Sequence, residues 1–278
     1  MKKILLVADS MLLTKGAMKY ACYIANMTGS RLTGVFVENE PSPDIPALTH
    51  APGQPYVKGK DHKPVRTMEQ LRNVDSSIHE FLMGCEKEGT TATVFRGSAV
   101  TPDEVIEEAK LSDLLIADAT TSLAEEEEPV PSRFIRHLLA GATCPVLITP
   151  PVFEAVEEVV FCYDHSDAAI HAMKQFSLLL PVFSECRATV LTVNKEGVIL
   201  PEEKRRLREW LCKYYDNAEF KVLEGDPDTQ LFTYLMKSKR TLVVMGAYGR
   251  SVVSRFFHQS HADLLMRSLA FPVFIAHT

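Results

Sequence analysis

The chain has 278 residues, of which 46% are hydrophobic and 24% charged, and its net charge at pH 7 is −6. This composition is typical of a soluble globular protein, and the length favours two domains. The acidic balance argues against broad affinity for nucleic acids or anionic membranes.

The N-terminus begins with an apolar run that Asp9 ends too early for a signal peptide, so we expect a cytoplasmic protein. Six cysteines are widely spaced without a C-x-x-C pair. This spacing predicts neither a disulfide framework nor a zinc site. We predict that the protein has no metal site built from its own side chains.

The first half of the chain alternates short runs rich in β-branched residues with longer segments of helical period. Residues 14–30 place Ala17, Tyr20 and Ile24 on one helical face, and Gly29 ends the helix. The expected strands are residues 4–8, 32–37, 92–96, 113–117 and 144–149. Strands that alternate with helices in this way form βαβ units with a parallel sheet. We therefore predict an α/β fold with helices on both faces of an open sheet.

Residues 41–66 interrupt this alternation. The stretch from 41 to 64 contains six prolines, which cannot continue a helix or a central strand. We predict a surface insertion here.

The second half repeats the order of the first. The aligned segments are 2–9 with 157–164, 31–40 with 187–196, 91–97 with 219–225, 113–121 with 241–249, and 144–150 with 271–277. This duplication predicts two domains, residues 1–150 and 151–278, each built around a doubly wound sheet of five parallel strands.

An aspartate ends the first strand of each half, Asp9 in one and Asp164 in the other. Ligands of open α/β sheets bind beyond the carboxyl ends of the strands, where neighbouring connections diverge. Each carboxylate is therefore placed either to accept a hydrogen bond from a ribose or a base, or to cap the following helix. The sequence leaves both interpretations open.

The fourth strand of the second half opens into Gly246 and Gly249, and Ser260 precedes the last apolar run. Glycines let backbone N–H groups approach a phosphate, and a helix starting at Ser260 would favour an anion, although any tight turn also uses glycine. The first half has Asp118 and Thr121 in place of these glycines. The second half therefore requires glycine where the first half does not. We interpret this difference as the steric requirement of a phosphate bound in the second half.

These features together resemble a tandem universal stress protein: the repeated halves, the first-strand aspartate, G-x-x-G after the fourth strand, and the serine before the last helix. The resemblance implies a Rossmann-like fold similar to that of the adenine nucleotide alpha hydrolases. It also implies that ATP, with magnesium, binds in the second half. The residues that it assigns to this site are Asp164, Val193, Gly246, Gly249 and Ser260.

The family resemblance also implies that the fifth strands pair, either across a homodimer or between residues 142–150 and 270–278 of this chain.

Two departures from the family pattern weaken the case for nucleotide. Gln259 stands where the pattern has glycine, although its amide can donate a hydrogen bond and Arg250 can neutralise phosphate charge. In the first half Pro131 and Ser132 occupy the positions of Gln259 and Ser260, and four glutamates, residues 125–128, repel a polyanion. We expect nucleotide in the second half only.

The sequence supports a non-catalytic stress-response protein, because it contains no Walker-type G-K-[ST] motif and no nucleophile elbow. The alternative is a nucleotide-free interaction protein that acts through dimerisation or a protein partner. An enzyme would need an acid or base near Asp164, and the adjacent His165 is expected to point elsewhere.

Overall fold

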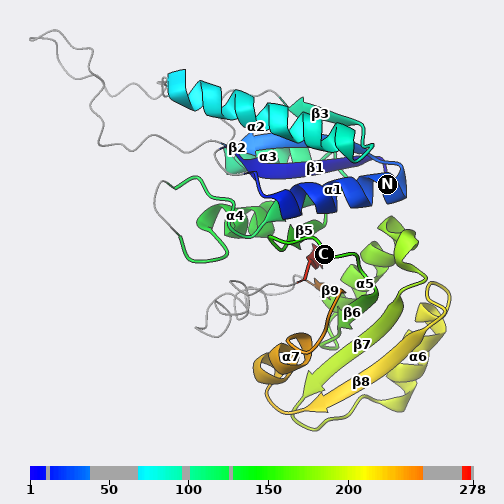
Figure 1. Ribbon diagram of the computed structural model, residues 1–278. Helices are drawn as coiled ribbons and strands as arrows, with labels where there is room; N and C mark the ends of the chain where they lie inside the picture. Colours follow the sequence, from blue (N-terminus) through cyan, green and yellow to red (C-terminus); the bar gives the residue numbers. More distant parts are fainter. Residues whose placement is uncertain (11–12, 38–67, 96–100, 125–127, 247–270, 277–278) are drawn as a thin grey trace, which may run out of the picture.

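The computed structural model describes residues 1–10, 13–37, 68–95, 101–124, 128–246 and 271–276. The first half alternates strands and helices as the sequence predicts (Figure 1). Its elements are β1 (Lys3–Asp9), α1 (Lys15–Thr28), β2 (Arg31–Val37), α2 (Met68–Lys87), β3 (Ala92–Phe95), α3 (Pro102–Ala109), β4 (Leu114–Asp118), α4 (Arg133–Gly141) and β5 (Val146–Thr149).

The second half repeats this order. Its elements are β6 (Glu158–Cys162), α5 (Asp167–Leu179), the 3-10 helix η1 (Pro181–Phe183), β7 (Arg187–Asn194), α6 (Pro201–Leu211), β8 (Ala218–Glu224), α7 (Pro227–Leu235), β9 (Thr241–Gly246) and β10 (Val273–Ala276). The predicted insertion at residues 41–66 lies outside the described residues.

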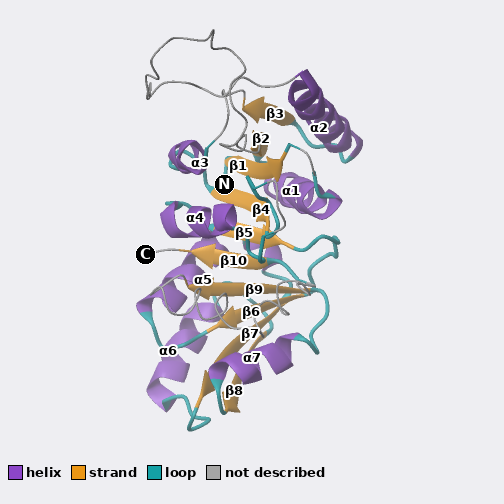
Figure 2. Ribbon diagram, turned by 90° about the vertical axis from the view of Figure 1, so that its left-hand side faces the viewer, coloured by secondary structure: helices purple, strands orange, loops and turns teal. Residues whose placement is uncertain are grey.

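The ten strands found in the described residues belong to one sheet, in the order β3-β2-β1-β4-β5-β10-β9-β6-β7-β8. Within each half every neighbouring pair is parallel, whereas β5 and β10 pair antiparallel, with Ile148 opposite Val273 and Val146 opposite Ile275. Figure 2 shows the strands in this order from one end of the molecule to the other. The two predicted five-stranded sheets are thus joined, and the expected pairing of the fifth strands within the chain is confirmed.

Helices cover both faces of the sheet. The cluster on one face takes side chains from α1, α2, α5 and α6, and the cluster on the other face takes them from α3, α4 and α7. Along β1, Leu6 joins the first cluster while Leu5 and Val7 join the second, because successive side chains of a strand point to opposite faces. This two-sided burial explains the continuous apolar runs that predict the strands.

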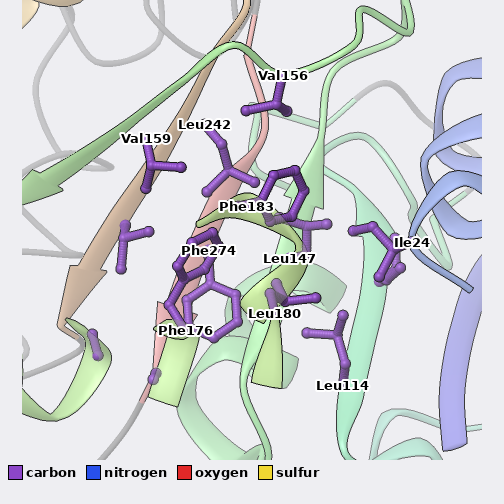
Figure 3. Close-up of a cluster of buried hydrophobic side chains, with 14 of the residues drawn as sticks. Ile24, Leu114, Leu147, Val156, Val159, Phe176, Leu180, Phe183, Leu242 and Phe274 are labelled. Carbon is purple, nitrogen blue, oxygen red and sulfur yellow. The ribbon is translucent and has the colours of Figure 1, made fainter. Parts of the chain in front are cut away.

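The core continues from one half of the chain into the other. Figure 3 shows Leu147 of β5 and Ile24 of α1 in the same cluster as Phe176 and Phe274 of the second half. The rings of Phe176 and Phe274 lie 5.1 Å apart, edge to face. The two halves therefore share one hydrophobic core on this face.

Helix α1 follows its sequence pattern closely. Ala17, Tyr20 and Ile24 are buried as expected, and Gly29 adopts the left-handed conformation, with φ at 60°, that ends the helix. Within the described part of the chain, none of the helices has the length and apolar content needed to span a bilayer.

Candidate functional site

Three of the predicted site residues meet at one edge of the sheet. Strands β9, β6 and β7 are adjacent and parallel, so their carboxyl ends lie side by side. Gly246 ends β9, Asp164 follows β6, and Val193 is the penultimate residue of β7. The other predicted site residues, Gly249, Arg250, Gln259 and Ser260, lie outside the described residues.

Asp164 shapes the turn between β6 and α5. Its Oδ1 accepts hydrogen bonds from the Ser166 backbone N–H, at 3.1 Å, and from the Ser166 hydroxyl, at 2.5 Å. The N-cap of α5 is Ser166 itself, whose Oγ accepts from the Ala169 N–H at 3.1 Å. Asp164 is exposed, so it supports the cap and still presents a carboxylate at the surface beside the helix N-terminus.

Gly246 has a structural reason to be glycine. A Cβ at this position would overlap the backbone carbonyl of Ala168 and the backbone nitrogen of Ala169, both in the first turn of α5. Backbone atoms of a packed helix cannot move aside as a flexible side chain can. The interpretation that only a phosphate would require glycine here is therefore wrong for Gly246, because the close packing of α5 on β9 already requires it.

Val193 contributes an apolar wall rather than a polar group. It lies opposite Leu223 of β8 and is half-buried against the cluster on the α3, α4 and α7 face. Its partial exposure at the end of β7 leaves an apolar surface next to the Asp164 turn.

A polar cluster that the sequence does not reveal lies beside Asp164. His165 has a left-handed backbone, with φ at 67°, and its Nδ1 is 3.0 Å from both carboxylate oxygens of Glu203 on α6. The buried Tyr163 hydroxyl also donates to Glu203 Oε1. His165 and Asp164 thus engage different partners, as expected, whereas Glu203 lies 38 residues away and only the fold brings it here.

The surroundings hold Glu203 in its charged form. Burial tends to raise the pKa of its carboxyl, but hydrogen bonds from Tyr163 and His165 outweigh this effect and lower it. Burial and the bond to Glu203 raise the pKa of the Tyr163 hydroxyl. In the neutral tautomer in which Nδ1 of His165 donates to Glu203, Nε2 carries no proton and can accept a hydrogen bond.

The first half places a matching set of residues at its own carboxyl edge, with one important difference. Asp9 and Val37 end β1 and β2 opposite one another, whereas Asp164 follows β6 and Val193 lies one residue before the end of β7. Asp118, however, replaces Gly246 at the end of the fourth strand. It is buried, and its Oδ1 accepts from the Thr120 backbone N–H at 2.8 Å. An additional carboxylate therefore occupies this edge in the first half.

The N-terminus of α4 is also occupied by the chain itself. Ser132, at the position of Ser260, is the N-cap: its Oγ accepts from the Ile135 N–H at 3.1 Å and donates to the Thr121 carbonyl. Glu128 accepts from the Arg133 backbone N–H at 3.3 Å and from the Ser122 hydroxyl at 2.7 Å. Only 12% of the Glu128 side chain is exposed. A carboxylate of the protein thus stands at the helix end that would favour a phosphate.

The described residues contain no group of three or more side chains placed to hold a metal ion.

No family model and no curated protein matches the sequence. Solved structures do match it: a universal stress protein from Archaeoglobus fulgidus DSM 4304 superposes with a TM-score of 0.67 at 12% identity, covering 98% of each chain. A Pseudomonas aeruginosa UCBPP-PA14 protein assigned to the universal stress proteins gives a TM-score of 0.56 at 17% identity, over 99% of this chain and 93% of that one.

The chain has the universal stress protein fold.

The predicted α/β class, with its largely parallel strand order, is confirmed by this fold. A shorter Archaeoglobus fulgidus universal stress protein, solved in complex with dAMP, matches 54% of this chain at 14% identity with a TM-score of 0.37. The nucleotide is a property of that protein. The likeness in fold rests on the two full-length matches.

Proposed function

We propose that the chain is a cytoplasmic stress-response protein of the universal stress family that binds an adenine nucleotide, ATP with magnesium, and does not catalyse a reaction. The site that we propose lies in the domain formed by residues 151–278. The observation that carries this proposal is the difference between the two carboxyl edges of the sheet. Among the described residues, β9 ends in Gly246, which has no side chain, whereas Asp118 and Glu128 place carboxylates at the first edge.

The carboxylates of the two edges are held differently. On the second edge, Asp164 is exposed beside the N-terminus of α5, whose first turn also carries Asp167, and its Oδ1 accepts from the Ser166 N–H. On the first edge, Glu128 already accepts from the N-terminus of α4. A polyphosphate there would have to displace a carboxylate from its hydrogen bonds and overcome its charge.

We assign roles to the site residues from the family pattern. Asp164 and Val193 hold the adenosine part, and Gly246 lets α5 pack closely against the end of β9. In the segment outside the described residues, Gly249, Arg250 and Ser260 contact the phosphates. Gln259 weakens the site, because its side chain occupies the position of the glycine that the pattern places there.

A second candidate, a nucleotide-free interaction protein, is favoured by a specific observation. Gly246 is required by the packing of α5, and Asp164 serves the turn before that helix. Both residues would therefore persist in a protein that had lost its ligand and acted through self-association or a protein partner.

Thermal unfolding with ATP, in the presence and absence of magnesium, tests the proposal. A ligand that binds only the folded state at 100 times its Kd stabilises it by about 2.7 kcal/mol, so Tm rises with ATP concentration. We expect Asp164→Ala to abolish this rise and Gln259→Gly to increase it. Asp164→Asn should retain the turn to Ser166, which separates loss of the carboxylate from loss of the turn.

Asp9→Ala is the matched control, because Asp9 ends the equivalent strand of the first half. We expect this variant to keep the full ATP-dependent rise. Equal losses in Asp9→Ala and Asp164→Ala would contradict a site in the second half alone. If millimolar ATP raises the Tm of neither the wild type nor Gln259→Gly, the nucleotide-free interaction protein is supported instead. Release of phosphate from ATP above the blank would indicate an enzyme.

A further inference from the structure

Two buried thiols face each other between the first two helices. Cys22 lies on α1 and Cys85 on α2, each is 1% exposed, and their Sγ atoms are 3.6 Å apart. All six cysteines lie in the described part of the chain and are free thiols. Among them, this is the pair whose sulfur atoms lie within hydrogen-bonding distance.

The helices around this pair are held in register. A Cβ on Gly84 would overlap the Met18 side chain, so α1 and α2 pack closely where Met18, one turn before Cys22, meets Gly84, the neighbour of Cys85. On the other side, Asn26 donates to the Glu88 carbonyl at 2.8 Å and accepts from the Thr90 hydroxyl at 3.0 Å. A disulfide needs an S–S distance of about 2.05 Å, so the sulfur atoms must approach by about 1.5 Å.

The pair also differs chemically from other cysteines of the chain. Hydrogen bonding to Cys85 lowers the pKa of the Cys22 thiol against the opposing effect of burial, and the same bond raises the pKa of Cys85. By contrast, burial raises the pKa of Cys144 to about 11 and that of Cys162 to about 12. Because the thiolate is the nucleophile, the lowered pKa of Cys22 makes this pair better suited to oxidation than Cys144 or Cys162.

Helix α2 offers a route by which a small oxidant reaches the thiols. It lies at the outer part of the first half (Figure 1). Between residues 72 and 87 its buried side chains are Phe81 and Cys85, while Leu82 and Met83 are exposed. Local opening of this outer helix would expose both thiols to solvent.

We propose that Cys22 and Cys85 are an oxidation site that hydrogen peroxide converts into a disulfide between α1 and α2. The Cys22 thiolate attacks the peroxide, so that an S–O bond forms, the O–O bond breaks and hydroxide leaves. Cys85 then attacks this sulfenic acid: the S–S bond forms, the S–O bond breaks and water leaves. In total, two thiols and one peroxide give one disulfide and two waters.

The disulfide would fasten α2 to α1 and enclose residues 23–84 in a covalent loop. Closing a long loop restricts the unfolded chain, so the oxidised protein resists thermal unfolding better than the reduced one. This inference is independent of nucleotide binding, since neither cysteine lies at the carboxyl edge that carries Asp164.

Peptide mapping of the full-length protein, treated with hydrogen peroxide and then alkylated, tests the proposal. We expect the peptides containing Cys22 and Cys85 to be recovered joined, with the loss of two hydrogen atoms, and to separate after dithiothreitol. We also expect Tm to rise by several degrees on oxidation and to fall again on reduction. Cys22→Ser and Cys85→Ser should each abolish the linkage and the rise.

Cys186→Ser is the control variant, because the Cys186 thiol donates to the Val156 carbonyl and has no sulfur partner among the described residues. It should keep the linkage and the rise. Peptide mapping of the wild type shows whether Cys22 and Cys85 become linked, even where a variant folds poorly. Recovery of Cys22 and Cys85 as free thiols from a sample in which the exposed Cys212 is oxidised would overturn the proposal.

Discussion

Gly246 shows how one glycine can satisfy a structural requirement at a position where a ligand site is expected. The backbone of Ala168 and Ala169 occupies the space that a side chain at 246 would fill. The glycine therefore does not by itself indicate a phosphate. Asp164, Val193 and the contrast with Asp118 carry the proposal instead.

At the residue scale, we predict that Gly246→Ala destabilises the protein by about 3 kcal/mol, because helix backbone must shift to admit the methyl group. Gly89→Ala is the comparison. Gly89 has φ at 69°, and nothing lies within 4 Å of the position that an added Cβ would take, so only backbone strain applies. That strain costs about 1 kcal/mol. Urea unfolding measures both variants, and equal losses would show that α5 does not require the glycine.

At the scale of single elements, the serines that cap the N-termini of α4 and α5 differ in how deeply they are buried. Ser132 caps α4 while it is buried and bonded to the Thr121 carbonyl. Ser166 caps α5 while it is only half-buried and bonded to Asp164. The buried cap belongs to the half that we expect not to bind nucleotide.

We predict that Ser132→Ala costs about 2 kcal/mol of unfolding free energy and Ser166→Ala about 1 kcal/mol. Both changes remove a cap, but the first leaves the Ile135 N–H and the Thr121 carbonyl without their partner away from water. Chemical denaturation of the two variants provides the measurement. A larger loss for Ser166→Ala would contradict the role of burial.

At the scale of the whole molecule, the antiparallel pair of β5 and β10 turns two repeated units into one sheet. Both hydrophobic clusters take residues from both halves. The pairing also gives β5 and β10 each a neighbouring strand on both sides.

We therefore predict that the two halves unfold in one calorimetric transition. Phe274→Ala should lower the temperature of that single transition and reduce the free energy of unfolding by about 3–5 kcal/mol, because Phe274 is fully buried against Phe176. Differential scanning calorimetry tests both expectations. Two resolved transitions, with only one shifted by the substitution, would show that the halves unfold separately.

Most of the fold could be predicted from the sequence because its signals are local. The apolar runs of β1 and β4, the helical face of Ala17 and Tyr20, and Gly29 as a terminator each depend on a few neighbouring residues. The candidate site could be predicted less completely. Asp164 stood out because the sequence pattern places it where the first strand of the second half ends, whereas Glu203 gave no signal, since α6 brings it to His165 from a distant part of the chain.

The sequence by itself determined the duplicated α/β order and the strand end near which each aspartate lies, because periodicity and repetition are properties of the chain. The family resemblance implied that the fifth strands pair, and the structure shows that they do so within the chain. Only the tertiary structure decided why residue 246 is glycine, that Glu128 accepts from the N-terminus of α4, and that Cys22 faces Cys85. These facts depend on how closely packed elements approach each other. Such distances follow from the packing of the whole core, and no short stretch of sequence encodes them.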